Sequence, residues 1–123
     1  MHVTSTALGD LEATFEAFNR ADPEPLIRAY ADDDVILVGT DAHEWHERHD
    51  AIAEVLRAEA GAVTADYEMR ELGLGPDAAV VVGRMVFALP DGTTIPARAT
   101  YALRREDAGW RIVHTHLSTP RGA

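Results

Sequence analysis

The segment Trp110–Ser118, with the sequence WRIVHTHLS, carries most of the fold prediction for this chain. Its β-branched and aromatic residues favour a strand, and successive side chains of a strand point to opposite faces. Strict alternation therefore predicts one shared face, formed by Trp110, Ile112, His114, His116 and Ser118. This face begins apolar and becomes polar, so we expect the strand to pass from the core into a pocket.

Three long segments rich in β-forming residues precede this strand: Thr64–Leu72, Ala78–Leu89 and Thr93–Arg105. The turn-forming sequences Gly-Pro-Asp, Pro-Asp-Gly and Asp-Ala-Gly separate them from one another and from the last strand. Such short connections join neighbouring antiparallel strands. The second half of the chain is therefore predicted to form an antiparallel meander.

The first half of the chain predicts helices, because its apolar residues recur mainly at spacings of three and four. In chain order we expect a helix over Thr6–Arg20, a short helix starting at Asp22 and Pro23, a buried strand at Val35–Val38, a loop at Gly39–His46, and a helix from near Glu47 to Gly61. Three helices followed by long antiparallel strands make an α+β domain, whose sheet must twist and curl. Helices on the concave face would close a cone whose open end suits a small molecule.

Length and charge limit the classes of function. A chain of 123 residues predicts a single domain over residues 1–123. The formal net charge of −10 disfavours binding to nucleic acid or to an anionic membrane surface. No apolar stretch approaches the roughly 20 residues of a membrane-spanning helix, and Met1–Thr4 opens no signal segment. We therefore expect a cytoplasmic protein.

Missing residue types narrow the chemistry. The chain contains no Cys and no Lys, which excludes catalysis by a thiolate or by a lysine Schiff base. Neither a Gly-x-Ser-x-Gly elbow nor a glycine-rich phosphate loop occurs, so the sequence implies no cofactor. Acid and base chemistry by His, Asp, Glu, Tyr and Arg, or simple binding, remains.

Three motifs resemble the SnoaL-like branch of the nuclear transport factor 2 (NTF2-like) superfamily. They are Gly39-Thr40-Asp41-x-x-Glu44-Trp45, Asp50-Ala51-Ile52 and the ending Gly109–Ser118. The ending is also similar to the association domain of calcium/calmodulin-dependent protein kinase II. The resemblance implies the cone fold described above, three helices on a long curved and mainly antiparallel sheet. Members range from ketosteroid isomerase and polyketide cyclases to non-catalytic assembly domains, so the fold alone assigns no reaction.

The resemblance also implies a mode of assembly, and one pocket residue of this chain departs from the kinase domain. Members generally form dimers or larger oligomers through the outer sheet face, which implies a homodimer here. We expect Val113 and Leu117, with Val81 and Met85, to supply that face. The kinase domain has a pocket arginine where this chain has Leu117, which weakens the case for carboxylate binding of that type.

Two groups of residues are the first site candidates. His114 and His116 fall on the predicted pocket face, where an imidazole can exchange a proton near neutral pH; the alternative is a structural pair. Asp41, His43 and Trp45 alternate in the loop expected at the mouth of the cone, where a carboxylate, an imidazole and an aromatic wall would meet. The alternative has Asp41 capping a turn and Trp45 filling the core.

Other candidates lie in the strands and helices. Arg84 and Arg98 interrupt apolar strands and could hold a ligand carboxylate, although such arginines usually face solvent or an interface. Tyr30 and Tyr101 could bind a ligand, or simply belong to the core. The three-residue spacing of the histidines over residues 43–49 raises a metal hypothesis, but no His-Glu-x-x-His spacing supports it.

Two functional hypotheses follow. In the first, an enzyme without a cofactor isomerises, cyclises, dehydrates or hydrates an apolar, oxygenated substrate, with Asp41 or His114 as its base. His43, His116 or Tyr101 would then donate hydrogen bonds to developing negative charge. In the second, a non-catalytic module oligomerises or binds a small carboxylate.

Overall fold

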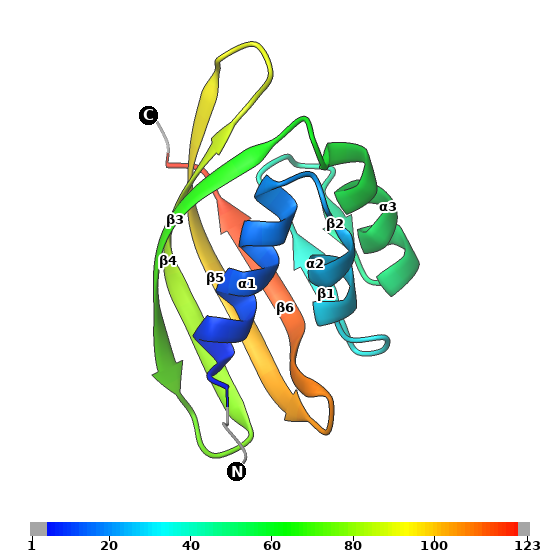
Figure 1. The fold of residues 1–123 in the computed structure, drawn as a ribbon, viewed down its shortest axis with the longest axis vertical. Helices are drawn as coiled ribbons and strands as arrows, with labels where there is room; N and C mark the ends of the chain where they lie inside the picture. The colour runs from blue at the N-terminus through cyan, green and yellow to red at the C-terminus, as the bar shows by residue number, and fades with distance from the viewer. Residues whose placement is uncertain (1–4, 121–123) are drawn as a thin grey trace.

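The computed structural model describes residues 5–120 of the chain, so the prediction about a signal segment at residues 1–4 lies outside it. Three helices precede the four long strands (Figure 1). The helices are α1 (Ala7–Asn19), α2 (Glu24–Ala29) and α3 (His49–Glu59). The strands are β1 (Ile36–Val38), β2 (Trp45–His46), β3 (Thr64–Gly73), β4 (Ala78–Ala88), β5 (Thr94–Glu106) and β6 (Gly109–Ser118).

The strands form one curved sheet in the order β2-β1-β6-β5-β4-β3. Every neighbouring pair is antiparallel except β1 and β6, which run parallel. Figure 1 shows α1 lying across one face of this sheet, with α2 and α3 beside it. The predicted α+β cone, with helices on a mainly antiparallel sheet, is confirmed.

Helix α1 is fixed at both ends by side-chain hydrogen bonds. The Thr6 hydroxyl accepts a hydrogen bond from the Gly9 amide at 2.9 Å, which caps the first turn. At the other end, Asn19 bonds both the amide and the carbonyl of Ala65 in β3, each at 2.8 Å. With both ends of the helix held in place, the buried side chains of Phe15 and Phe18 point toward the concave side of the sheet.

A β-bulge in β6 reverses which side chains face the core. Leu103 pairs with Ile112 but the preceding Ala102 pairs with His114, so Val113 is an extra residue opposite β5. Ile112 is fully buried, and beyond the bulge the buried residue is Thr115. The prediction that the two histidines share a face with Ile112 is wrong, because one inserted residue shifts the alternation.

The convex face of the sheet carries the side chains that alternate with the core. It displays a mixed set: Ile36, Val38, Val80, Val82, Arg84, Val86, Arg98, Thr100, His114 and His116. The residues predicted for this face lie elsewhere, because Val81 and Met85 are buried in the core and Leu117 lines the interior. Val113, the bulge residue, is half-buried against the core.

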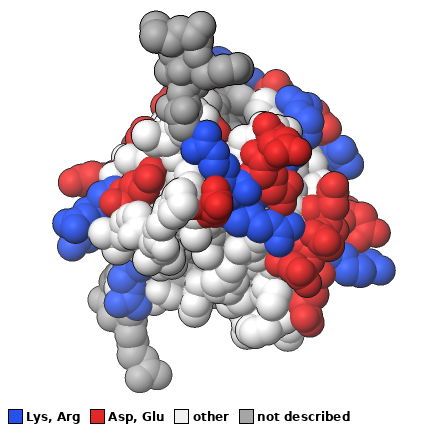
Figure 2. All heavy atoms as spheres, turned by 90° about the horizontal axis from the view of Figure 1, so that it is seen from below, with Lys and Arg blue, Asp and Glu red and all other residues white. Residues whose placement is uncertain are grey.

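The negative charge of the chain is unevenly spread over its surface. Seen from below, Asp and Glu side chains gather on one side, with arginines scattered among them (Figure 2). Three consecutive exposed carboxylates follow Ala31, at Asp32, Asp33 and Asp34, and Asp33 is paired with Arg104 at 2.9 Å. Among residues 5–120, no helix is long and apolar enough to cross a bilayer.

Candidate functional site

The concave face of the sheet and the helices enclose a cavity of about 360 Å³. Every helix and every strand except β2 contributes to its wall, and most of the contributing side chains are apolar. Among them are Phe15, Phe18, Leu56, Met85, Phe87 and Leu117. A largely apolar cavity of this size is typical of sites for small organic molecules.

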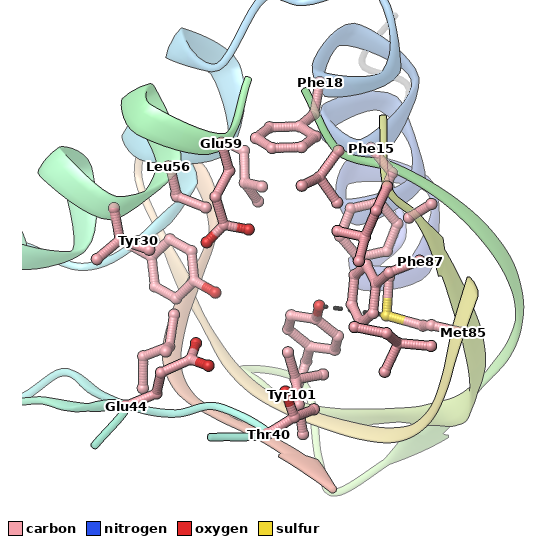
Figure 3. Close-up of a pocket in the computed structure, with 18 residues that line it drawn as sticks. Phe15, Phe18, Tyr30, Thr40, Glu44, Leu56, Glu59, Met85, Phe87 and Tyr101 are labelled. Carbon is pink, nitrogen blue, oxygen red and sulfur yellow. Dashed lines mark hydrogen bonds between the residues drawn. The ribbon is translucent and has the colours of Figure 1, made fainter. Parts of the chain in front are cut away.

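Few polar side chains interrupt this apolar wall, and the ionisable ones are acidic or phenolic. Figure 3 shows the carboxyl groups of Glu44 and Glu59 and the hydroxyl groups of Tyr30 and Tyr101 inside the cavity. Among the lining residues within the described part of the chain, none is Arg, Lys or His. The cavity therefore holds negative charge without a cationic side chain to balance it.

Glu59 is the carboxyl group most affected by this environment. Burial raises the pKa of Glu59 above its usual 4.5, and the nearby charge of Glu44 raises it further. Glu59 is also the last residue of α3, where the helix dipole adds partial negative charge. All of these effects favour the protonated form of the Glu59 carboxyl group.

Glu44 owes its position to the tight loop between β1 and β2. The Gly39 amide donates to the Glu44 carbonyl at 2.8 Å, and the Asp41 amide donates to Glu44 Oε1 at 3.1 Å. A Cβ atom on Gly39 would lie 2.4 Å from Glu44 Oε2 and 2.7 Å from Glu44 Cβ. Glycine at position 39 thus leaves the space that the Glu44 side chain occupies.

Tyr30 closes the cavity near Glu59. Its hydroxyl forms a hydrogen bond of 3.0 Å with the Thr115 hydroxyl, and both residues are buried. Burial raises the pKa of Tyr30, and the Glu59 charge raises it further although the Thr115 bond opposes this. The phenol therefore stays protonated at neutral pH and can serve as a hydrogen-bond donor.

Tyr101 lies on β5, on the opposite wall. Its ring packs against Phe15 with the ring centroids 5.5 Å apart, and its hydroxyl donates to the Met85 sulfur at 3.6 Å. Burial is the main cause that raises the pKa of Tyr101. A thioether is a weak acceptor, so this buried hydroxyl remains available to a ligand.

The structure brings only two of the predicted site residues, Tyr30 and Tyr101, to the cavity. Asp41 and His43 are exposed, and the Asp41 carboxylate accepts a hydrogen bond from the His43 amide at 3.0 Å. Asp41 therefore caps a turn, which was the alternative interpretation, and its assignment as catalytic base is withdrawn. Trp45 is 60% exposed and pairs with Val38, so it neither walls the cavity nor fills the core.

The two strand histidines lie on the convex face because of the bulge. His114 is half-buried, and its Nδ1 is 3.0 Å from the Ile36 carbonyl oxygen on the neighbouring strand. His116 is exposed, with its ring centroid 6.3 Å from that of His114. Neither side chain lines the cavity, so their proposed roles there are also withdrawn.

The arginines and the loop histidines are likewise outside the cavity. Arg84 and Arg98 are exposed and stand directly opposite each other on β4 and β5. His49 is bonded through Nε2 to the Ile27 carbonyl at 2.9 Å, at the start of α3. Over residues 5–120, no three potential metal ligands come together.

Sequence reasoning missed both glutamates of the cavity. A signal for Glu59 was present, since Ile52, Val55, Leu56 and Glu59 follow the spacing of one helix face. A carboxyl group at the end of an apolar stripe is unusual and points toward the interior. Glu44 gave no comparable signal, because its direction depends on the loop geometry at Gly39.

An apolar cavity inside a cone of this topology defines the class of protein as an NTF2-like pocket domain. The chain belongs to the SnoaL-like domain family, whose model matches residues 11–122. No functionally curated protein matches the chain.

Solved structures of the same fold cover nearly the whole chain. A candidate calcium/calmodulin-dependent protein kinase II association domain from Xanthomonas campestris is 21% identical, with a TM-score of 0.80 over 100% of this chain and 99% of that one. A similar domain from Thiobacillus denitrificans is 23% identical, with a TM-score of 0.78 over 98% and 100%. An NTF2-like protein of unknown function in nutrient uptake, from Rhodospirillum rubrum, is 26% identical, with a TM-score of 0.75 over 94% and 99%.

Proposed function

We propose that the cavity binds a small, mainly apolar molecule and that Glu59 acts as a general acid or base, giving a proton to this molecule or taking one from it. The reaction class would be isomerisation, cyclisation, dehydration or hydration without a cofactor. Glu59 takes the place of the Asp41 and His114 bases expected from the sequence. The observation that carries the proposal is the carboxyl group of Glu59, set in an apolar wall with its pKa raised by burial and by Glu44.

Proton transfer by Glu59 fits the chemistry of its surroundings. A general acid or base works best when its pKa is near the working pH, and burial moves a carboxyl group in that direction. The protonated hydroxyl of Tyr30 faces the same space and could donate a hydrogen bond to developing oxyanion charge. An acid or base and a donor would then act on the same ligand.

Binding without turnover is the second candidate, and the same cavity supports it. The form in which Arg84 and Arg98 hold a small carboxylate loses support, because both side chains lie on the convex face. A carboxylate inside the cavity would meet two glutamates and no cationic side chain among the described lining residues. We therefore do not propose carboxylate binding for this chain, whereas binding of an apolar molecule without turnover stays the second candidate.

Deuterium exchange tests the catalytic proposal without knowledge of the product. We expect the protein to speed exchange of α-protons in D₂O for members of a panel of apolar cyclic ketones, followed by proton NMR. Glu59→Gln should lower the rate by at least about 100-fold, in the range of a lost general base. Glu54→Gln, on the exposed side of the same helix, is the matched control. Equal rates for the wild type and Glu59→Gln would contradict the role of Glu59.

We also propose that the chain forms a homodimer through the convex face of the sheet. Trp45 and Val86, 60% and 40% exposed, lie on this face with the half-buried Val38, Val80 and Val82, in a patch that Arg84 and Arg98 interrupt. Exposed apolar side chains gathered on one face are a mark of an interaction surface. The similar structures described as association domains agree with assembly of this kind.

Analytical ultracentrifugation tests the dimer. We expect a mass twice that of the 13.4 kDa chain for the wild type, and a monomer for Val82→Arg, which places a charge in the patch. Leu74→Arg, in the exposed turn between β3 and β4, is the matched control and should stay dimeric. A monomeric wild type would overturn this proposal.

The cytoplasmic location expected from the sequence stays a prediction.

A further inference from the structure

Resting on the proposed binding function, we infer that the cavity takes an apolar amine, with its ammonium group between Glu44 and Glu59 and its apolar body among Phe15, Phe18 and Phe87. The inference concerns the charge of the ligand, which neither the fold nor the family assigns. It follows from three separate properties of the wall: its charge, its aromatic rings and one buried hydroxyl group.

The charge of the wall is negative and has no cationic partner among residues 5–120, where the Glu44 carboxyl group accepts only the Asp41 amide. The ion pairs among residues 5–120 do not include Glu44 or Glu59. Arg57, the arginine on the same helix as Glu59, is bonded through two nitrogens to Glu24, each at 3.0 Å. Two carboxylates that face one apolar space repel each other, and a cation between them would remove that repulsion.

The aromatic rings favour the same sign of charge. Phe15, Phe18, Tyr30, Phe87 and Tyr101 surround the space into which both carboxyl groups point (Figure 3). The faces of such rings attract a positive charge, most strongly where water is excluded. An ammonium would therefore be stabilised by the rings as well as by the carboxylates, whereas an anion would be repelled by both.

The hydroxyl group of Tyr101 adds a directional contact. Tyr101 is 4% exposed, and its hydroxyl points into the cavity with only the Met85 sulfur as its acceptor. No donor to the Tyr101 oxygen occurs among the hydrogen bonds of the described residues. Its oxygen can accept a hydrogen bond, and an ammonium N–H is a suitable donor.

Competing ligand charges fit less well. A carboxylate or phosphate would lie beside two acidic side chains with no cationic residue among the described lining residues. A neutral hydrocarbon would fill the apolar space but leave the two carboxyl groups facing each other. Of these three ligand classes, only the amine uses the apolar wall and the charge of the acidic groups together.

Matched ligands separate charge from shape. We would measure binding calorimetrically at pH 8 with three apolar bodies, phenylbutyl, naphthylmethyl and octyl, each as an amine, an alcohol and a carboxylic acid. We expect at least one amine to bind about tenfold or more tightly than its alcohol, which is the effect of a charge-assisted contact, and the acids to bind most weakly. Glu44→Gln and Glu59→Gln should each remove most of the difference.

The control for general attraction by an acidic protein is Glu54→Gln. It changes the net charge by the same amount, but its side chain is exposed on the other side of α3. We expect it to leave the preference for the amine unchanged. An equal loss in Glu54→Gln would assign amine binding to the surface and overturn the inference.

The remaining outcomes distinguish this inference from the function on which it rests. If compounds bind but no amine binds more tightly than its alcohol and its acid, the amine inference fails while ligand binding by the cavity stands. If none of the nine compounds binds, both the inference and the proposed binding function fail. If amines bind and both glutamine variants lose that preference, the inference is supported.

Discussion

The two faces of one sheet differ in the side chains that carry their chemistry. On the concave side, helix α3 and the loop before β2 supply the carboxyl groups of Glu59 and Glu44, and the phenols of Tyr30 and Tyr101 lie in the same apolar cavity. The convex face instead carries histidines and arginines beside valines: Arg84, Arg98, His114, His116, Val80 and Val82. Strand β5 supplies both sides, with Tyr101 toward the cavity and Arg98 toward solvent, so residue type alone does not place a side chain in the site.

Register, rather than composition, decides which side chains of β6 face the cavity. Val113 is the extra residue of the bulge, and it sends His114 outward and Thr115 inward. Thr115 then meets Tyr30 in the core, and His114 meets the Ile36 carbonyl on the convex side. The one extra residue therefore keeps both histidines out of the cavity wall.

Exchanging His114 and Thr115 should have the largest effect, because it keeps the composition and reverses which of the two side chains faces the core. The double variant His114→Thr with Thr115→His places an imidazole in the buried position of Thr115 and removes the hydrogen bond to Tyr30, so we expect a loss of about 4 kcal/mol in the free energy of unfolding. Urea unfolding followed by circular dichroism measures it. Val113→Ala changes the bulge residue without moving a polar side chain inward and should cost only about 1 kcal/mol. An exchange variant as stable as Val113→Ala would contradict the assignment of positions 114 and 115 to opposite faces.

Tyr30→Phe should have the next largest effect. The change removes the hydrogen bond to Thr115 and leaves the Thr115 hydroxyl buried without that partner, which costs about 1 to 3 kcal/mol. Chemical denaturation measures the loss. The combined variant with Thr115→Val removes both polar groups, so it should be less destabilised than the sum of the single changes. Strictly additive losses would argue against a buried hydrogen bond between Tyr30 and Thr115.

Gly39→Ala should act on the concave face alone. Its new Cβ atom would meet the Glu44 side chain, so Glu44 must move and the protein should lose about 1 kcal/mol of stability. The pKa of Glu59 should fall toward its usual value, because the charge that helps to raise it has moved. Carbon NMR of the Glu59 carboxyl group measures this change. An unchanged Glu59 titration would mean that Gly39 does not hold Glu44 in place.

Glu59→Gln should raise the melting temperature by about 3 °C at pH 8. A carboxyl group whose pKa is raised in the folded state binds its proton more tightly there than in the unfolded chain. Its ionisation therefore lowers stability as the pH rises from 4.5 through the folded-state pKa, and glutamine avoids this loss. Thermal melts of both proteins at pH 4 and pH 8 measure it, and the gain should disappear at pH 4. A gain that is equal at both values would contradict the ionisation account.

Arg84→Gln and Arg98→Gln should have the smallest effect on the cavity. Both side chains are exposed on the convex face, so we expect ligand affinity within about twofold of the wild type and stability changes under about 0.5 kcal/mol. Calorimetric binding measures the affinity. A tenfold loss in either variant would show that the two faces are not chemically separate.

Much of the fold could be predicted from the sequence, because strands and helices follow local periodicity. The four long strands were expected within a residue or two of β3 to β6, and the expected helix over Thr6–Arg20 matches α1. The third helix begins at His49, two residues after the expected start, and Trp45–His46 is a short strand within the expected loop. These differences arise at ends of elements, where tertiary pairing decides the boundary.

The site was less predictable than the fold. Tyr30 and Tyr101 were expected as ligand contacts or as core residues, and the structure places both in the cavity wall. The orientation of His114 depends on the bulge, and that of Glu44 depends on the space above Gly39. Neither feature leaves a periodic pattern in the sequence, since each is set by the pairing of distant segments.

The titration of Glu59 is the decisive measurement for an acidic, proton-transferring cavity. Carbon NMR of protein labelled at the glutamate side-chain carboxyl carbon would follow Glu59 over pH 3 to 9 in the wild type and in Glu44→Gln. We expect a pKa above 4.5 that falls when the Glu44 charge is removed. A Glu59 that titrates at or below 4.5 and ignores Glu44→Gln would contradict the claim that the concave face is an acidic, proton-transferring cavity.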